Sequence, residues 1–167
     1  MSTFRRRIYR RPGQLLSDAR AILARRHEMK SVMRGETLSD AFRERLMIAV
    51  TEVNACRYCA YFHAQQALTA GLSEAELAAL AEGDFEGSPP EERPALLYAQ
   101  HWAEADGQPD PAARARLFEL YGDEKARAIE LALSVIRMGN LMGNTFDYVL
   151  YRLSFGRWGG ATSPGSQ

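Results

Sequence analysis

Two cysteines, three residues apart, are the side chains of this chain best suited to chemistry. The sequence contains two cysteines, Cys56 and Cys59, in the motif Cys-Arg-Tyr-Cys. Residues three apart on a helix have Cβ atoms roughly 5–6 Å apart, which a disulfide can span with modest adjustment. A disulfide that closes so short a loop constrains the unfolded chain little, so stability is a weak reason for the pair. We therefore predict a dithiol that cycles reversibly between a reduced and an oxidised form.

A histidine one helical turn after the second cysteine is the candidate base. Helical side chains lean toward the N-terminus of their helix, so the imidazole of His63 is expected to reach back toward the Cys59 sulfur. One thiolate would attack, the second thiol would close the disulfide, and the histidine would accept a proton. A thiol pair at the start of a helix also lies at the positive end of the helix dipole, which favours the thiolate.

Carboxylates on the preceding predicted helix supply a partner for this histidine. Glu44 and Glu52 are eight residues apart, two steps of four, so they share one helix face. A carboxylate next to His63 would orient the imidazole ring and raise its basicity. Because Asn54-Ala55 looks like a helix break, the two helices can fold against each other and bring Glu44 toward His63. Glu52 is the reserve candidate for the same proton relay.

The same residues allow other interpretations. With His63, the cysteine pair could form part of a zinc-stabilised structural module, although a closed zinc site usually has four ligands and no second cysteine pair is present. A general protein disulfide reductase would use the same cysteines, and a redox sensor would form the disulfide but turn over slowly. Two inert core cysteines are the remaining alternative.

Helical periodicity is nearly continuous along the chain, and no stretch alternates like a strand. We predict an all-α, single-domain, homo-oligomeric helical bundle with a basic N-terminal arm (1–11), a helical domain (12–155) and a flexible tail (156–167). The expected helices cover approximately residues 12–34, 40–53, 56–71, 74–82, 91–105, 111–121 and 126–153.

Residues 138–147 are unusual for a core helix because they combine two glycines with asparagines and Asp147. Gly139 and Gly143 lie four residues apart and allow a neighbouring helix to approach closely. One interpretation is that Asn140, Asn144 and Asp147 line the site or a subunit contact, and the other is that the asparagines form hydrogen bonds across a tight helix crossing. We favour the tight crossing.

The composition excludes several classes of function. Lys plus Arg (21) equals Asp plus Glu (21), so no overall field attracts nucleic acid or a membrane. No apolar run approaches the roughly 20 residues that a membrane helix needs. Phosphate-loop and dinucleotide motifs are missing, so we expect neither a cofactor nor a metal. Arginines at residues 5–11 alternate with apolar side chains, which suggests an arm that docks on a neighbouring subunit. We expect a cytoplasmic protein.

The stretch from Arg43 to His63 resembles the alkyl hydroperoxidase D-like branch of the carboxymuconolactone decarboxylase family. The family pattern is a glutamate twelve residues before C-x2-C-x3-H, and Glu44 has that spacing from Cys56. The resemblance implies an all-α homo-oligomer that reduces hydroperoxides through its thiols, with Glu44 and His63 as a proton relay. It also implies reduction by an external dithiol, such as a lipoyl-bearing protein. The decarboxylase branch generally lacks the cysteine pair, and Tyr58 stands where alkyl hydroperoxidase D has a histidine.

Two physical arguments disagree on which sulfur would attack the peroxide. The helix dipole favours Cys56 but is worth only about 0.3–1 kcal/mol. Contact with a general base favours Cys59 and contributes about 10²–10⁴ in rate. The larger effect, together with the resemblance, predicts that Cys59 is oxidised first and that Cys56 then closes the disulfide.

Overall fold

The computed structural model describes residues 4–160, and within this range it contains helices and no strand. The prediction of an all-helical protein is therefore confirmed. No helix in the described range is long and apolar enough to cross a membrane. The helices are α1 (Pro12–Ala24), α2 (Arg26–Met33), α3 (Asp40–Asn54), α4 (Arg57–Thr69), α5 (Glu74–Ala81), α6 (Arg93–Glu104) and α7 (Pro111–Leu153).

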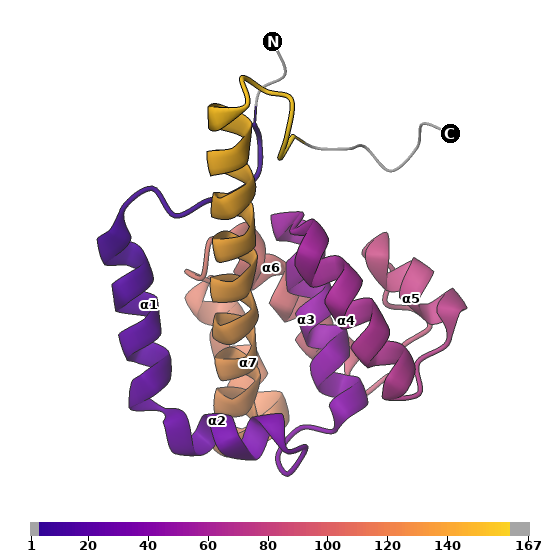
Figure 1. Cartoon of the computed structure of the whole chain (residues 1–167). Coiled ribbons are helices and arrows are strands. Elements are labelled where there is room, and N and C mark those ends of the chain that lie inside the picture. The colour runs from indigo at the N-terminus through magenta and orange to yellow at the C-terminus, as the bar shows by residue number, and fades with distance from the viewer. Residues whose placement is uncertain (1–3, 161–167) are drawn as a thin grey trace.

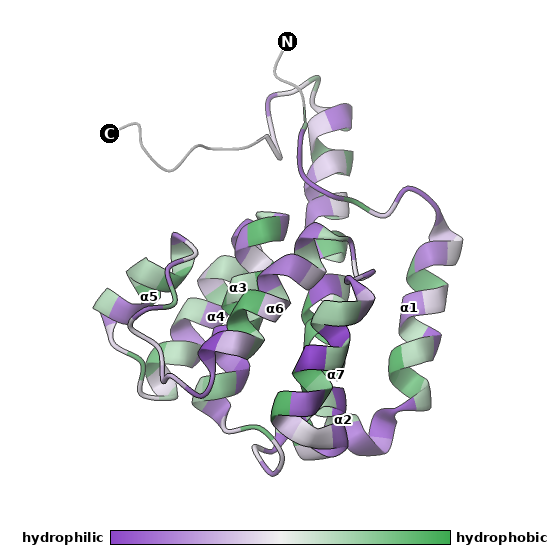
Figure 2. Cartoon of the chain, turned by 180° about the vertical axis from the view of Figure 1, so that it is seen from behind, coloured by the Kyte–Doolittle hydropathy of each residue, from purple (hydrophilic) through white to green (hydrophobic). Residues whose placement is uncertain are grey.

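The long helix α7 runs through the middle of the molecule. In Figure 1, α1 lies on one side of it, α3 and α4 lie on the other, and α2 crosses its lower end. Helix α3 packs against α4, α6 and α7, and every residue from Phe42 to Thr51 along it is buried. Hydrophobic and hydrophilic residues intermingle along α6 and α7 (Figure 2), as expected of helices with one buried face. Helix α3 is therefore the central element against which the site is built.

The N-terminal helical region differs from the prediction. The sequence predicted one helix over residues 12–34, whereas the structure contains two, with a break at Arg25 (φ −106°, ψ 24°). Both α1 and α2 pack against α7, and the break lets the chain change direction between them. A second break was predicted between residues 121 and 126. Gly122 provides it with φ 72° and ψ 167°, a conformation that favours glycine.

The junction between α3 and α4 places the cysteines. Ala55 adopts a left-handed conformation (φ 53°, ψ 42°), and its N–H donates to the Thr51 carbonyl at 2.7 Å. This residue ends α3 and turns the chain back, so the predicted break at Asn54-Ala55 is present. Cys56 then caps α4, and its sulfur accepts a hydrogen bond from the Cys59 N–H at 3.4 Å. Cys56 therefore precedes the first turn of α4 instead of lying within it.

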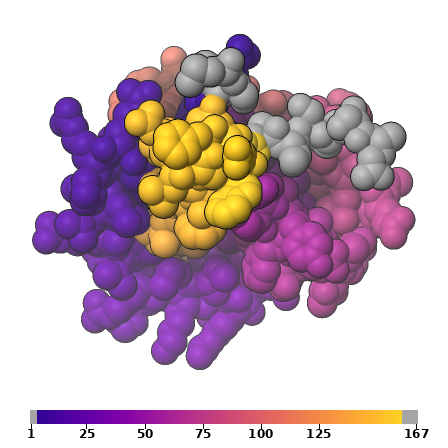
Figure 3. All heavy atoms as spheres, turned by 45° about the horizontal axis from the view of Figure 1, so that its top comes forward, coloured from indigo at the N-terminus to yellow at the C-terminus, as the bar shows by residue number. Residues whose placement is uncertain are grey.

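Residues 4–11 and 154–160 both fold back onto α7. The Tyr9 N–H donates to the Thr145 hydroxyl at 3.0 Å, and the Asn144 amide donates to the Arg7 carbonyl at 3.1 Å. In Figure 3 the yellow C-terminal residues lie between the indigo N-terminal residues and the magenta residues. The predicted arm thus contacts α7 of its own chain. The division into 1–11, 12–155 and 156–167 stays a prediction, and residues 1–3 and 161–167 lie outside the described range.

Candidate functional site

The two cysteine sulfurs face each other at the start of α4. Both cysteines are free thiols, and their sulfurs lie 2.7 Å apart. The Cys56 side chain is fully buried, whereas Cys59 is partly exposed. The sequence predicted that the two sulfurs would be neighbours, and the structure brings them into hydrogen-bonding contact. The exposed member of the pair is the one that a substrate can reach.

The pair is polarised toward a thiolate at Cys56. A hydrogen bond from the Cys59 thiol, helped by backbone N–H groups at the start of α4, lowers the pKa of Cys56 to about 6 in spite of its burial. The same hydrogen bond, followed by burial, raises the pKa of Cys59. The two sulfurs therefore share one proton near neutral pH, and the pair carries a single negative charge.

A buried carboxylate–imidazole pair joins α3 to α4, the helix that begins at the dithiol. Glu44 Oε2 and His63 Nδ1 are 2.7 Å apart, and both side chains are buried. Since the carboxylate accepts from Nδ1–H, the other ring nitrogen, Nε2, is the one that can accept or donate a proton toward a substrate. Within residues 4–160, no hydrogen bond joins His63 to either sulfur. The structure thus assembles the predicted Glu44–His63 pair but does not show the predicted contact with Cys59.

Arg43 positions the glutamate, and sequence reasoning missed it. Its guanidinium donates twice to Glu44 Oε1, at 3.2 Å each, and also donates to Asp40 Oδ1 at 2.8 Å. Glu44 Oε2 is left for His63. Neighbouring residues on a helix do not normally face each other, so the Arg43-Glu44 sequence carried no signal for this contact.

Two asparagines of α7 hold the end of α3, directly before the cysteines. Asn140 accepts from the Asn54 amide and donates to the Thr51 hydroxyl, both at 3.1 Å. Asn144 donates to the Asn54 carbonyl at 2.7 Å. Asn140 also forms a hydrogen bond with Cys59 that lowers the pKa of that thiol, against the larger effects that raise it. The asparagines therefore form the hydrogen-bonded crossing that the sequence favoured, and Asn140 in addition reaches the site.

The crossing is close because Gly143 faces Cys56. A Cβ atom at Gly143 would lie 2.8 Å from Cys56 Sγ and 3.4 Å from Tyr58 Cδ2. Real Cβ atoms essentially never approach other atoms within 3.0 Å, so any side chain here would displace the sulfur. At Gly139, by contrast, a Cβ atom would meet no described atom within 4 Å. One of the two predicted glycines is thus required for the close approach.

Tyr58 contacts α7 and not the Glu44–His63 pair. Its hydroxyl donates to Asp147 Oδ1 at 2.7 Å, and Arg57 donates to the same oxygen at 2.7 Å. Asp147 is completely buried and also accepts from Arg6 at 2.6 Å. The sequence suggested that Asp147 lines the site or a subunit contact, but it did not indicate these cationic partners.

Glu52, the reserve candidate for the relay, lies apart from His63 and the cysteines. It lines a cavity of about 320 Å³ between α3, α5 and α6, together with Gln100 and Glu104. Burial raises the pKa of the Glu52 carboxyl. Neither His63 nor the cysteines line this cavity. The structure therefore brings Glu44, and not the reserve candidate Glu52, to the histidine.

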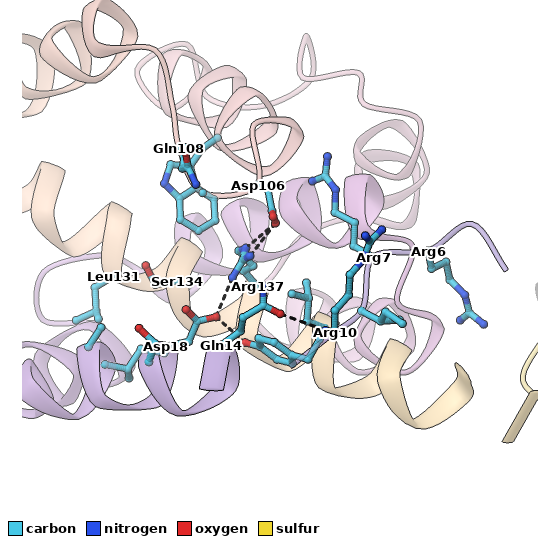
Figure 4. A pocket seen from close by; sticks show the side chains of 18 of the residues that line it. Arg6, Arg7, Arg10, Gln14, Asp18, Asp106, Gln108, Leu131, Ser134 and Arg137 are labelled. Atoms are coloured by element: carbon cyan, nitrogen blue, oxygen red, sulfur yellow. Dashed lines mark hydrogen bonds and ion pairs between the residues drawn. The ribbon is translucent and has the colours of Figure 1, made fainter. Parts of the chain in front are cut away.

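A larger cavity of about 860 Å³ lies between residues 4–10, α1 and α7 (Figure 4). Arg137 lines it and forms ion pairs with Asp18 at 2.8 Å and Asp106 at 2.7 Å. The cavity lining includes neither cysteine. In the described part of the chain, no group of three or more His, Cys, Asp or Glu side chains is arranged to hold a metal ion.

Comparison with known proteins gives one informative match. The model of the carboxymuconolactone decarboxylase family matches residues 20–104, a range that contains Glu44, both cysteines and His63. The asparagines and Asp147 on α7 lie outside the matched range. The comparison with curated proteins finds no match.

Proposed function

Because the chain belongs to the carboxymuconolactone decarboxylase family, we propose that it is a thiol-dependent peroxidase of the alkyl hydroperoxidase D-like type. The observation that carries this proposal is the pair of sulfurs, 2.7 Å apart, whose hydrogen bond lowers the pKa of Cys56 to about 6. A dithiol that is ionised at neutral pH is a nucleophile, and its second sulfur is in place to close a disulfide.

The accessible sulfur is the one that attacks. Cys56 is fully buried, whereas Cys59 is partly exposed. Transfer of the shared proton across the 2.7 Å between the sulfurs puts the negative charge on Cys59 as the peroxide approaches. The Cys59 thiolate then bonds to the distal peroxide oxygen, the O–O bond breaks, and Cys59 becomes a sulfenic acid. The alkoxide that leaves takes a proton from the His63 imidazolium.

The second half of the cycle forms the disulfide. His63, now neutral, takes the proton of the Cys56 thiol and passes it to the hydroxide that leaves the sulfenic acid as the S–S bond forms. The products are one alcohol, one water and one disulfide, so two electrons have moved from the sulfurs to the peroxide. Glu44 stabilises the imidazolium and fixes its ring, as carboxylates do for catalytic histidines. An external dithiol, such as a lipoyl-type protein, restores both thiols by exchange.

The decisive experiment is peroxide consumption with a panel of dithiol donors. The wild type is expected to consume alkyl hydroperoxide catalytically with at least one donor, and Cys56→Ser and Cys59→Ser are expected to lose turnover. A wild type that forms its disulfide but consumes no peroxide with any donor would refute the proposal. Reduction of protein disulfides in the same assay would instead support the disulfide reductase interpretation.

We also propose that the protein is a homo-oligomer. Four side chains spaced as one stripe along the C-terminal half of α7 are apolar and exposed: Met142, Phe146, Val149 and Leu153. Phe146 packs against Tyr58 with ring centroids 6.3 Å apart, so the stripe continues onto α4. A contiguous exposed apolar surface of this kind is typical of protein–protein contacts. The stripe runs beside the cysteines, so self-association would cover this side of the site.

A further inference from the structure

A buried carboxylate lies on α7 beside the dithiol and has no part in the cycle above. Asp147 is 0% exposed. It lies one turn after Gly143, where a Cβ atom would lie only 2.8 Å from the Cys56 sulfur. A negative charge at this position disfavours the thiolate, and Asp147 indeed acts to raise the pKa of Cys56. An unneutralised carboxylate at this position would therefore work against ionisation of the dithiol.

Two arginines bind this carboxylate, one on each oxygen. Arg6 of the N-terminal segment donates to Oδ2 at 2.6 Å, and Arg57 of α4 donates to Oδ1 at 2.7 Å. The Arg6 side chain is 8% exposed, whereas that of Arg57 is 43% exposed. Solvent screens the exposed ion pair far more than the buried one. Arg6 is therefore the stronger counter-charge.

Two further contacts of its own side chain, and one of the neighbouring backbone, hold Arg6 in this place. Its guanidinium also donates to the Gly159 carbonyl and stacks on the Phe4 ring, 4.6 Å from the centroid. In Figure 4 the Arg6 side chain points away from the Arg137 ion-pair cluster. The backbone of the same segment is fixed to α7, because Asn144 donates to the Arg7 carbonyl. The N-terminal segment thus holds the Arg6 guanidinium against Asp147.

We infer that the N-terminal segment completes the dithiol site: Arg6 neutralises Asp147 and so keeps the Cys56–Cys59 pair in its nucleophilic, singly charged form. The inference rests on the proposed thiol chemistry and adds Arg6 and Asp147 to it as positioning residues. The charged and titratable groups around the pair are Arg57 and Tyr58 from α4, Asp147 from α7 and Arg6 from the N-terminal segment, together with the Glu44–His63 pair that joins α3 to α4.

The test is a titration of the reduced protein that needs no peroxide turnover. Thiolate is followed by its ultraviolet absorbance and by the rate of iodoacetamide alkylation against pH, in the wild type and in Arg6→Gln. Losing a neighbouring counter-charge should raise the pKa of Cys56 by about 0.5–1 unit. Alkylation at a pH near the wild-type pKa should then be about 2- to 5-fold slower. An unchanged pH profile in a folded Arg6→Gln variant would overturn the inference.

Three further variants separate the charge effect from a structural one. Arg5→Gln should leave the profile unchanged, because Arg5 is exposed and its side chain makes no hydrogen bond or ion pair with other described residues. Arg57→Gln should give a smaller shift than Arg6→Gln because its ion pair is more exposed. Adding Asp147→Asn to Arg6→Gln should restore the low pKa, since the charge that Arg6 neutralises is then gone. Failure of this rescue, with thermal unfolding unchanged, would contradict the inference.

Two results keep the test independent of folding and of the proposed function. If Arg6→Gln does not fold, Asp147→Asn alone should lower the pKa of Cys56, and a rise would overturn the inference. If the titration behaves as expected but no peroxide is consumed, the proposed peroxidase activity fails while the role of Arg6 stands.

Discussion

Glu44 Oε2 and His63 Nδ1 lie 2.7 Å apart in the interior, although 19 residues separate them along the chain. The two residues come from α3 and α4, which the left-handed Ala55 folds against each other. Arg43 holds the other carboxylate oxygen, so Glu44 has little freedom to turn away from the ring. A buried pair of this kind orients the histidine ring, the arrangement expected of a proton relay.

The relay predicts a large loss of rate when either partner is changed. Glu44→Gln and His63→Gln should each slow peroxide-dependent oxidation by about 10²-fold or more, the usual scale for loss of general acid–base help. The double variant should be little slower than the single ones because the pair acts as a unit. Stopped-flow oxidation of the reduced protein measures this. Glu52→Gln is the matched control and should react at nearly the wild-type rate, because Glu52 lines a different cavity. Near-wild-type rates in both relay variants would exclude the relay.

The accessibility of the sulfurs predicts the order of oxidation. In Cys56→Ser, peroxide should produce a sulfenic acid on Cys59, because that sulfur is partly exposed. A dimedone-type probe followed by mass spectrometry detects it. In Cys59→Ser, the buried Cys56 should react slowly. Labelling on Cys56 in preference to Cys59 would contradict this prediction. It would show that the position at the helix start and the lowered pKa of Cys56 determine which sulfur attacks the peroxide.

The lowered pKa of Cys56 predicts the pH dependence of thiol reactivity. The nucleophile is the thiolate, so the rate should rise as pH increases through about 6, the pKa of Cys56, and then level off. A protein whose cysteine had an ordinary pKa would still be gaining rate near pH 8.5. Alkylation rates across this range distinguish the two cases. A midpoint near the ordinary cysteine value would contradict the shared-proton description of the pair.

Helix α7 approaches Cys56 closely at Gly143 but has open space at Gly139, so replacing each glycine with alanine should have different effects on stability. Gly143→Ala should destabilise the protein by about 1–3 kcal/mol, since its Cβ atom would overlap the Cys56 sulfur. It should also slow disulfide formation by displacing that sulfur. Gly139→Ala should be neutral or stabilising by about 0.5–1 kcal/mol, because nothing described lies within 4 Å and alanine is the better helix former. Denaturant unfolding measures both, and equal effects would refute the proposed packing.

The apolar stripe on α7 predicts self-association. Light scattering should give a mass well above the 18.7 kDa of one chain. Phe146→Glu should shift the protein toward the monomer, because a charge would replace an exposed apolar contact. Glu119→Ala, an exposed change at the other end of α7, is the control. A concentration-independent monomer in the wild type would refute the homo-oligomer.

Some features of the structure are determined by local geometry. The hydroxyls of Ser39 and Ser73 cap α3 and α5, because each accepts a hydrogen bond from the backbone N–H three positions later, within one turn. Cys56 and Cys59 are neighbours for the same reason, since three residues at the start of a helix span less than one turn. The link from Glu44 to His63 was also predicted, but it needed the helix break and the resemblance to a known family.

Other features depended on how the helices pack, which no local pattern specifies. The break at Arg25 involves neither glycine nor proline, so no residue type in the sequence indicated it. It allows both α1 and α2 to pack against α7. Arg6 and Asp147 are 141 residues apart, and their pairing follows from the path of the N-terminal segment along α7. Helix crossing likewise decided that Glu44 and not Glu52 faces His63, although both share one helix face. Residue types and spacing determined which groups could react. The packing of α3, α4 and α7 determined which of them meet, because contacts between helices depend on crossing geometry and burial.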